Sequence, residues 1–128
     1  MNSIKSNILQ DGSRNFVITT LGVLDTSDYP VTNITDIAIL KPIPTQLRLD
    51  KIFYSIEDGL SCLLWWEAAP DILLMPISGR GMFDFEWFAG HSSPKNVGAT
   101  GNIRLSTQGY ISGVKHFTLV LDFVKQGI

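Results

Sequence analysis

The sequence predicts an all-β protein, a single-domain β-sandwich of the jelly-roll type with about eight or nine strands. Segments rich in β-branched and aromatic residues recur at short, regular intervals and are separated by turn residues. Several of these segments alternate apolar and polar residues, and no segment has sustained helical periodicity. The length of 128 residues fits one core, because single domains usually contain about 100–150 residues.

The first strands follow from local composition. We expect residues 1–12 to form an N-terminal arm or a short edge strand, ended by the turn signal Asp11-Gly12, and residues 13–128 to form the sandwich. Residues 15–24 (NFVITTLGVL) predict a strand in which Gly22 marks a bulge or a bend. Residues 31–40 (VTNITDIAIL) predict a second strand, and the prolines that follow predict an extended connector.

A change of parity marks the strand predicted for residues 45–56. Leu47 and Leu49 lie on one face, whereas Ile52 and the apolar residues after it occupy positions of the opposite parity. A one-residue slip reverses the two faces of a strand unless a bulge absorbs it, so we predict a β-bulge at Asp50-Lys51.

Residues 58–77 predict two more strands. Asp58-Gly59 predicts a tight hairpin turn, so residues 60–68 (LSCLLWWEA) are expected to pair back against the preceding strand. That segment is apolar on both faces, which is typical of a central or covered strand. Residues 72–77 (ILLMPI) predict a short edge strand, because Pro76 lacks a backbone donor.

Residues 82–88 have the strictest alternation in the chain. Gly79-Arg80-Gly81 predicts a turn, after which Phe83, Phe85 and Trp87 share one face and the acidic residues share the other. We expect the aromatic face to be the core face.

The C-terminal third contains a long loop and two strands. Residues 89–101 (AGHSSPKNVGATG) predict a contact loop, because long loops in compact domains are usually functional or mobile. Residues 102–107 predict a strand with Ile103 and Leu105 directed inward, and residues 114–125 predict the last strand. Its core-facing residues are expected to be Phe117, Leu119, Leu121 and Phe123.

Composition excludes several classes of function. A net charge of −2 with scattered basic residues argues against direct nucleic-acid binding, which needs clustered Lys and Arg. The N-terminus lacks a signal-peptide pattern, and no apolar run approaches the roughly 20 residues of a membrane span, so we expect no membrane partner. Only 17% of the residues are charged, against about 25% in typical soluble domains, so apolar surface is expected on the outside, as in a subunit of an assembly.

No combination of residues predicts catalysis, a metal or a cofactor, and we expect a non-enzymatic protein. Cys62 lies among leucines and tryptophans and is expected to be a buried, inert thiol. His91 and His116 are the only histidines, too few for a zinc site. Asp84 and Glu86 are spaced like glycosidase carboxylates, but alternation alone places such residues on the wet face of a strand.

The tryptophans leave one binding function open. An exposed indole stacks well on a ligand, so Trp65, Trp66 or Trp87 would suit a carbohydrate-binding module. Trp65 and Trp66 are adjacent and point to opposite faces, and we favour their burial under a second layer or a neighbouring subunit.

Four segments together resemble small β-rich structural proteins of tailed-bacteriophage virions. They are DGSRN at 11–15, RLDKIFYSI at 48–56, LLWW at 63–66 and GRGMFDF at 79–85. The resemblance spans most of the chain and transfers no site residue. It implies a capsid decoration (cement) protein that bridges capsid subunits, or alternatively a neck or tail subunit. It further implies synthesis in the host cytoplasm, a place on the capsid exterior, and contact with the major capsid protein. Contact with copies of itself is also implied, in a homo-oligomer such as a trimer.

The residues we expect at such contacts come from the N-terminal segment, the tryptophan pair and the long loop. They are Ile4, Ile8, Trp65, Trp66, His91, Lys95 and Asn96.

Overall fold

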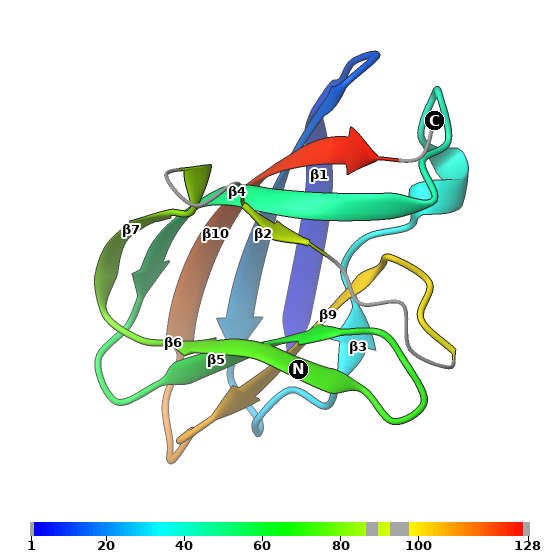
Figure 1. Cartoon of the computed structure of the whole chain (residues 1–128). Coiled ribbons are helices and arrows are strands. Elements are labelled where there is room, and N and C mark those ends of the chain that lie inside the picture. The colour runs from blue at the N-terminus through cyan, green and yellow to red at the C-terminus, as the bar shows by residue number, and fades with distance from the viewer. Residues whose placement is uncertain (1, 87–89, 93–97, 127–128) are drawn as a thin grey trace.

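The computed structural model describes residues 2–86, 90–92 and 98–126, which form two antiparallel sheets packed face to face (Figure 1). The larger sheet has the order β1-β2-β10-β4-β7, and β8 also pairs with β4. Its strands are β1 (Ser3–Asp11), β2 (Asn15–Leu24), β10 (Lys115–Gln126), β4 (Gln46–Ile56), β7 (Arg80–Asp84) and β8 (His91–Ser92). The smaller sheet has the order β3 (Thr32–Asn33), β9 (Ile103–Gln108), β5 (Ser61–Trp66) and β6 (Ile72–Ile77).

The strand order is that of a jelly roll, as the sequence predicts. If β1 and the short β8 are set aside, every connection among the remaining eight strands crosses between the sheets except the one from β5 to β6, as two interleaved Greek keys require. The first and last of the eight, β2 and β10, are neighbours in one sheet, while β3 and β9 are neighbours in the other. Strand β1 is an addition at the β2 edge.

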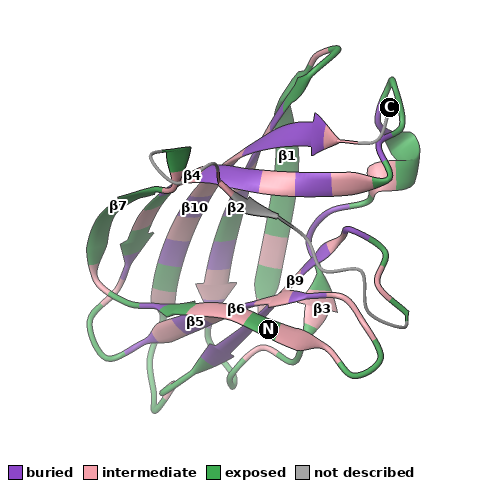
Figure 2. Ribbon diagram, viewed as in Figure 1, coloured by how far each residue is buried: buried purple, intermediate pink, exposed green. Residues whose placement is uncertain are grey.

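The core lies between the two sheets. Along β10, every second side chain points into it. Phe117, Leu119, Leu121 and Phe123 are all buried, which confirms the predicted inward face of this strand. The smaller sheet faces them with Leu64, Trp66, Ile103 and Leu105, also buried. In Figure 2 the buried residues recur along β2, β10 and β4, the three central strands of the larger sheet.

The bulge predicted at Asp50-Lys51 is present in β4. Asp122 of β10 lies opposite Lys51, and the next residue, Phe123, lies opposite Leu49, so Asp50 is the extra residue. The buried carboxylate of Asp50 accepts hydrogen bonds from Nε and Nη2 of Arg48 at 2.8 and 3.2 Å. The bulge therefore keeps Leu49 and Ile52 on the same inner face.

The turn at Asp58-Gly59 is present, but it does not close a hairpin. The Leu60 N–H donates to the Glu57 carbonyl at 3.2 Å, and Gly59 has φ +84, in the left-handed region. The turn carries the chain from β4 in the larger sheet to β5 in the smaller one. The predicted pairing was wrong because a turn specifies a reversal of direction and not the sheet that the next strand joins. The central position predicted for β5, between β9 and β6, is confirmed.

Residues 31–40 form only a short strand, which corrects the second predicted strand. After β3 the chain enters the 3-10 helix η1 (Ile37–Ile39), which begins where the Asp36 side chain accepts from the Ala38 N–H at 3.1 Å. Ile34 and Leu40 are buried at either end of this segment. A loop that covers the core therefore buries Ile34 and Leu40, whereas Val31 and Ile39 stay exposed.

The N-terminal segment lies at the edge of the larger sheet as a nine-residue strand. It pairs with β2 from Ser3 to Asp11, with an irregularity at Leu9. The Asp11 carboxylate bonds the ammonium of Lys125, whose side chain is fully buried, and accepts from the Lys41 N–H at 3.0 Å. Of the two expectations for residues 1–12, the structure has the edge strand and not a free arm.

The aromatic face predicted at β7 points inward, and Phe85 packs against the core, but Phe83 is not buried as a core residue would be. Phe83 is 39% exposed, although it lies opposite the buried Ile52. It stacks on Tyr54 and on the half-buried Phe85, with centroids 5.5 and 6.0 Å apart. The inward direction is correct, but β7 is an edge strand with little cover (Figure 2). Trp87, the third member of the face, lies outside the described residues.

Gly22 causes neither a bulge nor a bend, because the pairing of β2 with both neighbours continues through it. It faces the ring of Phe117 on β10 instead. A Cβ at this position would overlap the Phe117 ring, with Cζ as the nearest atom, well inside van der Waals contact. Glycine is required here for space.

Gly22→Ala is therefore expected to destabilise the protein by about 2 kcal/mol, as overpacking of a core usually does. Gly12→Ala is the control, since the nearest atom to the added Cβ would be 3.5 Å away, an ordinary contact. Urea unfolding of both variants measures the difference. Equal stabilities would contradict the assigned role of Gly22.

Candidate functional site

The outer face of the larger sheet carries a row of side chains that crosses four strands. Thr19, Val120, Phe53 and Met82 lie directly opposite one another on β2, β10, β4 and β7, and we call them the outer row. Their chain neighbours Ile18, Leu119 and Ile52 are buried in the core, so alternation directs the row outward.

Three of the four residues in the outer row are apolar; Thr19 and Val120 are half-buried, whereas Phe53 and Met82 are open. Phe53 and Met82 are 48% and 50% exposed, and Leu21, two residues from Thr19 on the same face, is 44% exposed. A shallow hollow of about 240 Å³ lies beside the row, between Phe53, Val120, Tyr54 and Gly81. Contiguous exposed apolar surface of this kind marks an interaction site more often than single exposed residues do.

The residues two positions away from the row are polar or charged on β10, β4 and β7 and apolar on β2. On one side, the Arg80 flank comprises Leu21, Thr118, Ser55 and Arg80, which again lie opposite one another. On the other side, the Asp84 flank comprises Val17, Asp122, Lys51 and Asp84.

The Asp84 flank is locally acidic. Burial raises the pKa of the Asp122 carboxyl, the charges of Asp50 and Glu86 raise it further, and Lys51 opposes them. The ammonium of Lys51 lies 3.6 Å from the Glu86 carboxylate. Asp84 accepts from the Glu86 N–H at 2.9 Å. Asp84 and Glu86 are thus exposed carboxylates with structural contacts, in keeping with the wet face that alternation predicts.

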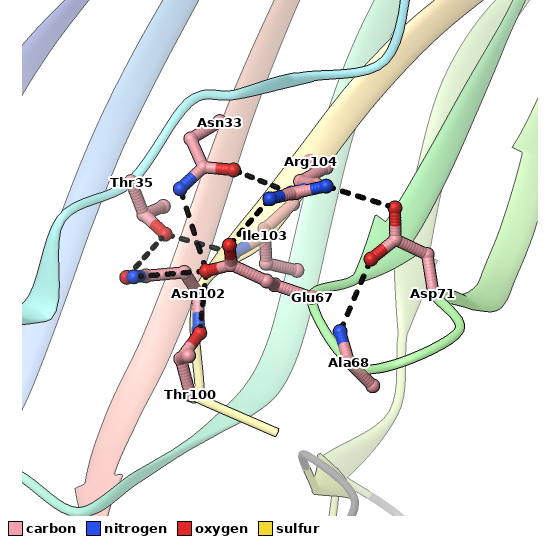
Figure 3. A network of polar contacts seen from close by, with 9 residues as sticks. All are labelled: Asn33, Thr35, Glu67, Ala68, Asp71, Thr100, Asn102, Ile103 and Arg104. Atoms are coloured by element: carbon pink, nitrogen blue, oxygen red, sulfur yellow. Dashed lines mark hydrogen bonds and ion pairs between the residues drawn. The ribbon is translucent and has the colours of Figure 1, made fainter. Parts of the chain in front are cut away.

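The opposite face of the molecule, on the smaller sheet, carries a polar network centred on Arg104 of β9 (Figure 3). Its guanidinium donates to Glu67 at 2.5 Å, to Asp71 at 3.1 Å and to the Asn33 amide oxygen at 2.6 Å. Glu67 also accepts from the Thr100 hydroxyl at 2.6 Å. The hydrogen bond from Thr100 has the largest effect in lowering the pKa of Glu67. The hydrogen bond and the charge of Arg104 lower it further, and burial opposes both.

This network ties the smaller sheet together. Asn33 belongs to β3, Arg104 to β9, and Glu67 and Asp71 to the connection between β5 and β6. Asn102 extends the network to the start of η1, because its amide oxygen accepts from the Ile37 N–H at 2.9 Å. The polar groups bond mainly to one another, so the arrangement is suited to holding the loops and not to chemistry.

The two adjacent tryptophans lie on opposite faces of β5, as predicted. Trp66 is buried in the core. Trp65 lies on the outer face, opposite Arg104, and its indole N–H donates to the Ser106 hydroxyl at 3.0 Å. Only Trp65 of this pair therefore reaches a surface.

The structure places only some of the other expected contact residues. Ile4 is partly buried against the core, while Ile8 is exposed and lines a hollow of about 500 Å³ between β1, β2 and the loop around η1. The backbone of His91 pairs with Leu49 in β8. Its side chain, together with Lys95 and Asn96, lies outside the described residues, as does most of the predicted contact loop.

Groups with catalytic or metal-binding potential are dispersed. Cys62 is buried, as predicted, and burial raises the pKa of its thiol to about 12. His116 is exposed on the outer side of β10. Within the described ranges, no group of three or more His, Cys, Asp or Glu side chains could hold a metal ion.

Comparison with known proteins adds no neighbour: no family model, no curated protein and no solved structure matches the chain. The part of the chain that the structure describes contains no helix long and apolar enough to cross a membrane.

Sequence reasoning missed the outer row. Val120 is recognisably an outer-face residue from the alternation of β10, and Phe53 from that of β4 after the bulge. No sequence signal shows that the two are cross-strand neighbours, because this depends on which strands pair.

Proposed function

We propose that this chain is a non-enzymatic structural protein of a tailed-phage virion, a capsid decoration protein that stabilises the head by bridging capsid subunits. The outer row is the observation that carries the proposal. A row of this kind, in which Phe53 and Met82 are exposed apolar residues, suits a subunit that buries this face against others. The low charged fraction and the resemblance to small virion proteins point the same way.

The jelly-roll fold supports the proposal only in part. Jelly rolls occur in viral capsid proteins, but also in lectins and other families, and a fold by itself does not imply a function. The surface of the larger sheet is therefore the stronger support for a virion role. A neck or tail subunit would use the same kind of surface, and copy number separates it from a decoration protein.

The test is incorporation into particles of the phage that encodes the chain, measured by quantitative mass spectrometry against the major capsid protein. Hundreds of copies per particle are expected. A dozen or fewer would transfer the role to the neck or tail, and absence from particles would overturn the proposal.

A pair of matched variants connects incorporation to the outer face. Phe53→Ser is expected to reduce the copy number, because it removes the largest side chain of the outer row. Leu73→Ser is the control, since Leu73 is also 48% exposed but lies on β6 of the smaller sheet. Equal incorporation of both variants would count against the outer row as the binding face.

Glycan binding is a second candidate, favoured by the position of Trp65. Its indole lies on the outer face of the smaller sheet beside Arg104, where aromatic and hydrogen-bonding groups combine as sugar sites require. A glycan array with the wild-type protein and Trp65→Ala tests it: specific binding that the substitution abolishes would support this candidate over the first.

A further inference from the structure

We propose that the outer row binds the outer row of a second copy of this chain, about a two-fold axis that runs along the row in the plane of contact. The inference deepens the proposed function, because it takes the same face to be an interface and names its occupant. It is argued from the arrangement of charges and hydroxyl groups on either side of the row.

The proposed axis turns each strand over onto the same strand of the partner, in the reverse direction. A residue two positions to one side of the row then lies over the residue two positions to the other side. On β7, Arg80 and Asp84 are each two residues from Met82, about 7 Å along the strand. Arg80 of each copy therefore lies over Asp84 of the other, which gives two symmetric ion pairs.

The other strands match in the same way. On β10 the Thr118 hydroxyl meets the Asp122 carboxylate, and on β4 the Ser55 hydroxyl meets the Lys51 ammonium. On β2 the apolar Leu21 meets the apolar Val17. These matches bring no like charges together, and each polar group finds a donor or an acceptor. This is the self-complementarity that an isologous interface needs.

The apolar centre fits the same axis. Phe53 lies on the axis, so the Phe53 rings of the two copies meet, and the hollow lined by Val120, Tyr54 and Gly81 lies next to them. Sheets that pack face to face keep their strand directions within about 30° of each other. This angle displaces Arg80 sideways from Asp84 of the other copy at β7, and the long arginine side chain can span the displacement.

A two-fold axis along the strands is disfavoured by charge. An axis along β10 would place the outer face of β1 over β7, which brings Lys5 close to the partner's Arg80. It would also place each Asp122 over its symmetry mate. The charges therefore select the axis along the outer row.

Charge reversal tests the arrangement in purified protein by analytical ultracentrifugation over a range of concentrations. The wild type is expected to be a reversible dimer. Arg80→Asp and Asp84→Arg should each weaken the dimer about tenfold, because each replaces two attractive pairs by two repulsive ones. The double variant should recover wild-type association, and an equimolar mixture of the two single variants should form the heterodimer.

Several outcomes would overturn the inference. They are a monomer at every concentration, a trimer, a dimer that ignores both reversals, or reversals that the double variant does not rescue. Stronger association of the Arg80→Asp variant would indicate a two-fold axis along the strands, and this result would also overturn the inference. Circular dichroism of each variant shows that it is folded.

The test separates this inference from the proposed function. A protein that enters particles in hundreds of copies but does not dimerise contradicts only the two-fold contact. A charge-dependent dimer that is absent from particles contradicts only the virion role.

Discussion

Phe123→Ala is expected to lower the free energy of unfolding by about 3–5 kcal/mol, the usual cost of truncating a buried phenylalanine. Phe123 is fully buried on β10 and stacks on Phe16 of β2, with ring centroids 5.6 Å apart. Its removal leaves a cavity between the two sheets that neighbouring strands, held by their hydrogen bonds, cannot fill.

The control for this substitution is Phe83→Ala, which removes the same ring from the partly open edge strand β7. Because Phe83 is 39% exposed, a loss below about 1.5 kcal/mol is expected. Urea unfolding at protein concentrations low enough to avoid association measures both. A similar loss for the two variants would mean that a partner or another segment covers β7.

Asp11→Asn is expected to cost about 3 kcal/mol, because it leaves the fully buried ammonium of Lys125 without its counter-charge. The lower end of the range for buried pairs applies, since the Asp11 carboxylate is itself partly exposed. The double variant Asp11→Asn, Lys125→Met should recover most of the loss, because a buried ion pair replaced by apolar atoms is often neutral in stability.

The pH dependence of this stability loss shows whether the Asp11–Lys125 pair stabilises the fold through charge or through packing. The hydrogen bond from Lys125 holds the pKa of Asp11 below its ordinary value of 3.8, against the opposing effect of burial. A carboxyl group whose folded pKa is lowered stabilises the fold fully above the unfolded value and loses this contribution as the pH falls through the folded pKa. The difference between wild type and Asp11→Asn should therefore be constant near neutral pH and shrink below about pH 4. A difference independent of pH would indicate a packing effect.

Local pattern predicted those features that depend on neighbours along the chain. The inward face of β10 follows from strict alternation, and the bulge at Asp50 follows from the parity change between Leu49 and Ile52. The buried state of Cys62 follows from its apolar surroundings in sequence. In each case successive side chains of a strand point to opposite faces, and the apolar ones must be buried. Together these two requirements determine which residues face the core.

Features that depend on neighbours in space were decided by the tertiary structure. The turn at Asp58-Gly59 is readable from sequence, but the sheet that β5 joins is not, because the reversal is the same in both cases. Phe83 points inward as its parity predicts, yet it stays exposed because β7 lies at an edge. Gly22 shows no sequence sign that it makes room for Phe117, which comes from the far end of the chain.

The same division holds for the candidate site. The sequence is enough to predict an all-β chain with a surplus of apolar residues, and hence an interaction surface. Only the pairing of β2, β10, β4 and β7 set Val120, Phe53 and Met82 in one row, with Arg80 and Asp84 equidistant from it. The physical reason is that alternation specifies which face a side chain takes, whereas the register between strands distant in sequence specifies its neighbours on that face.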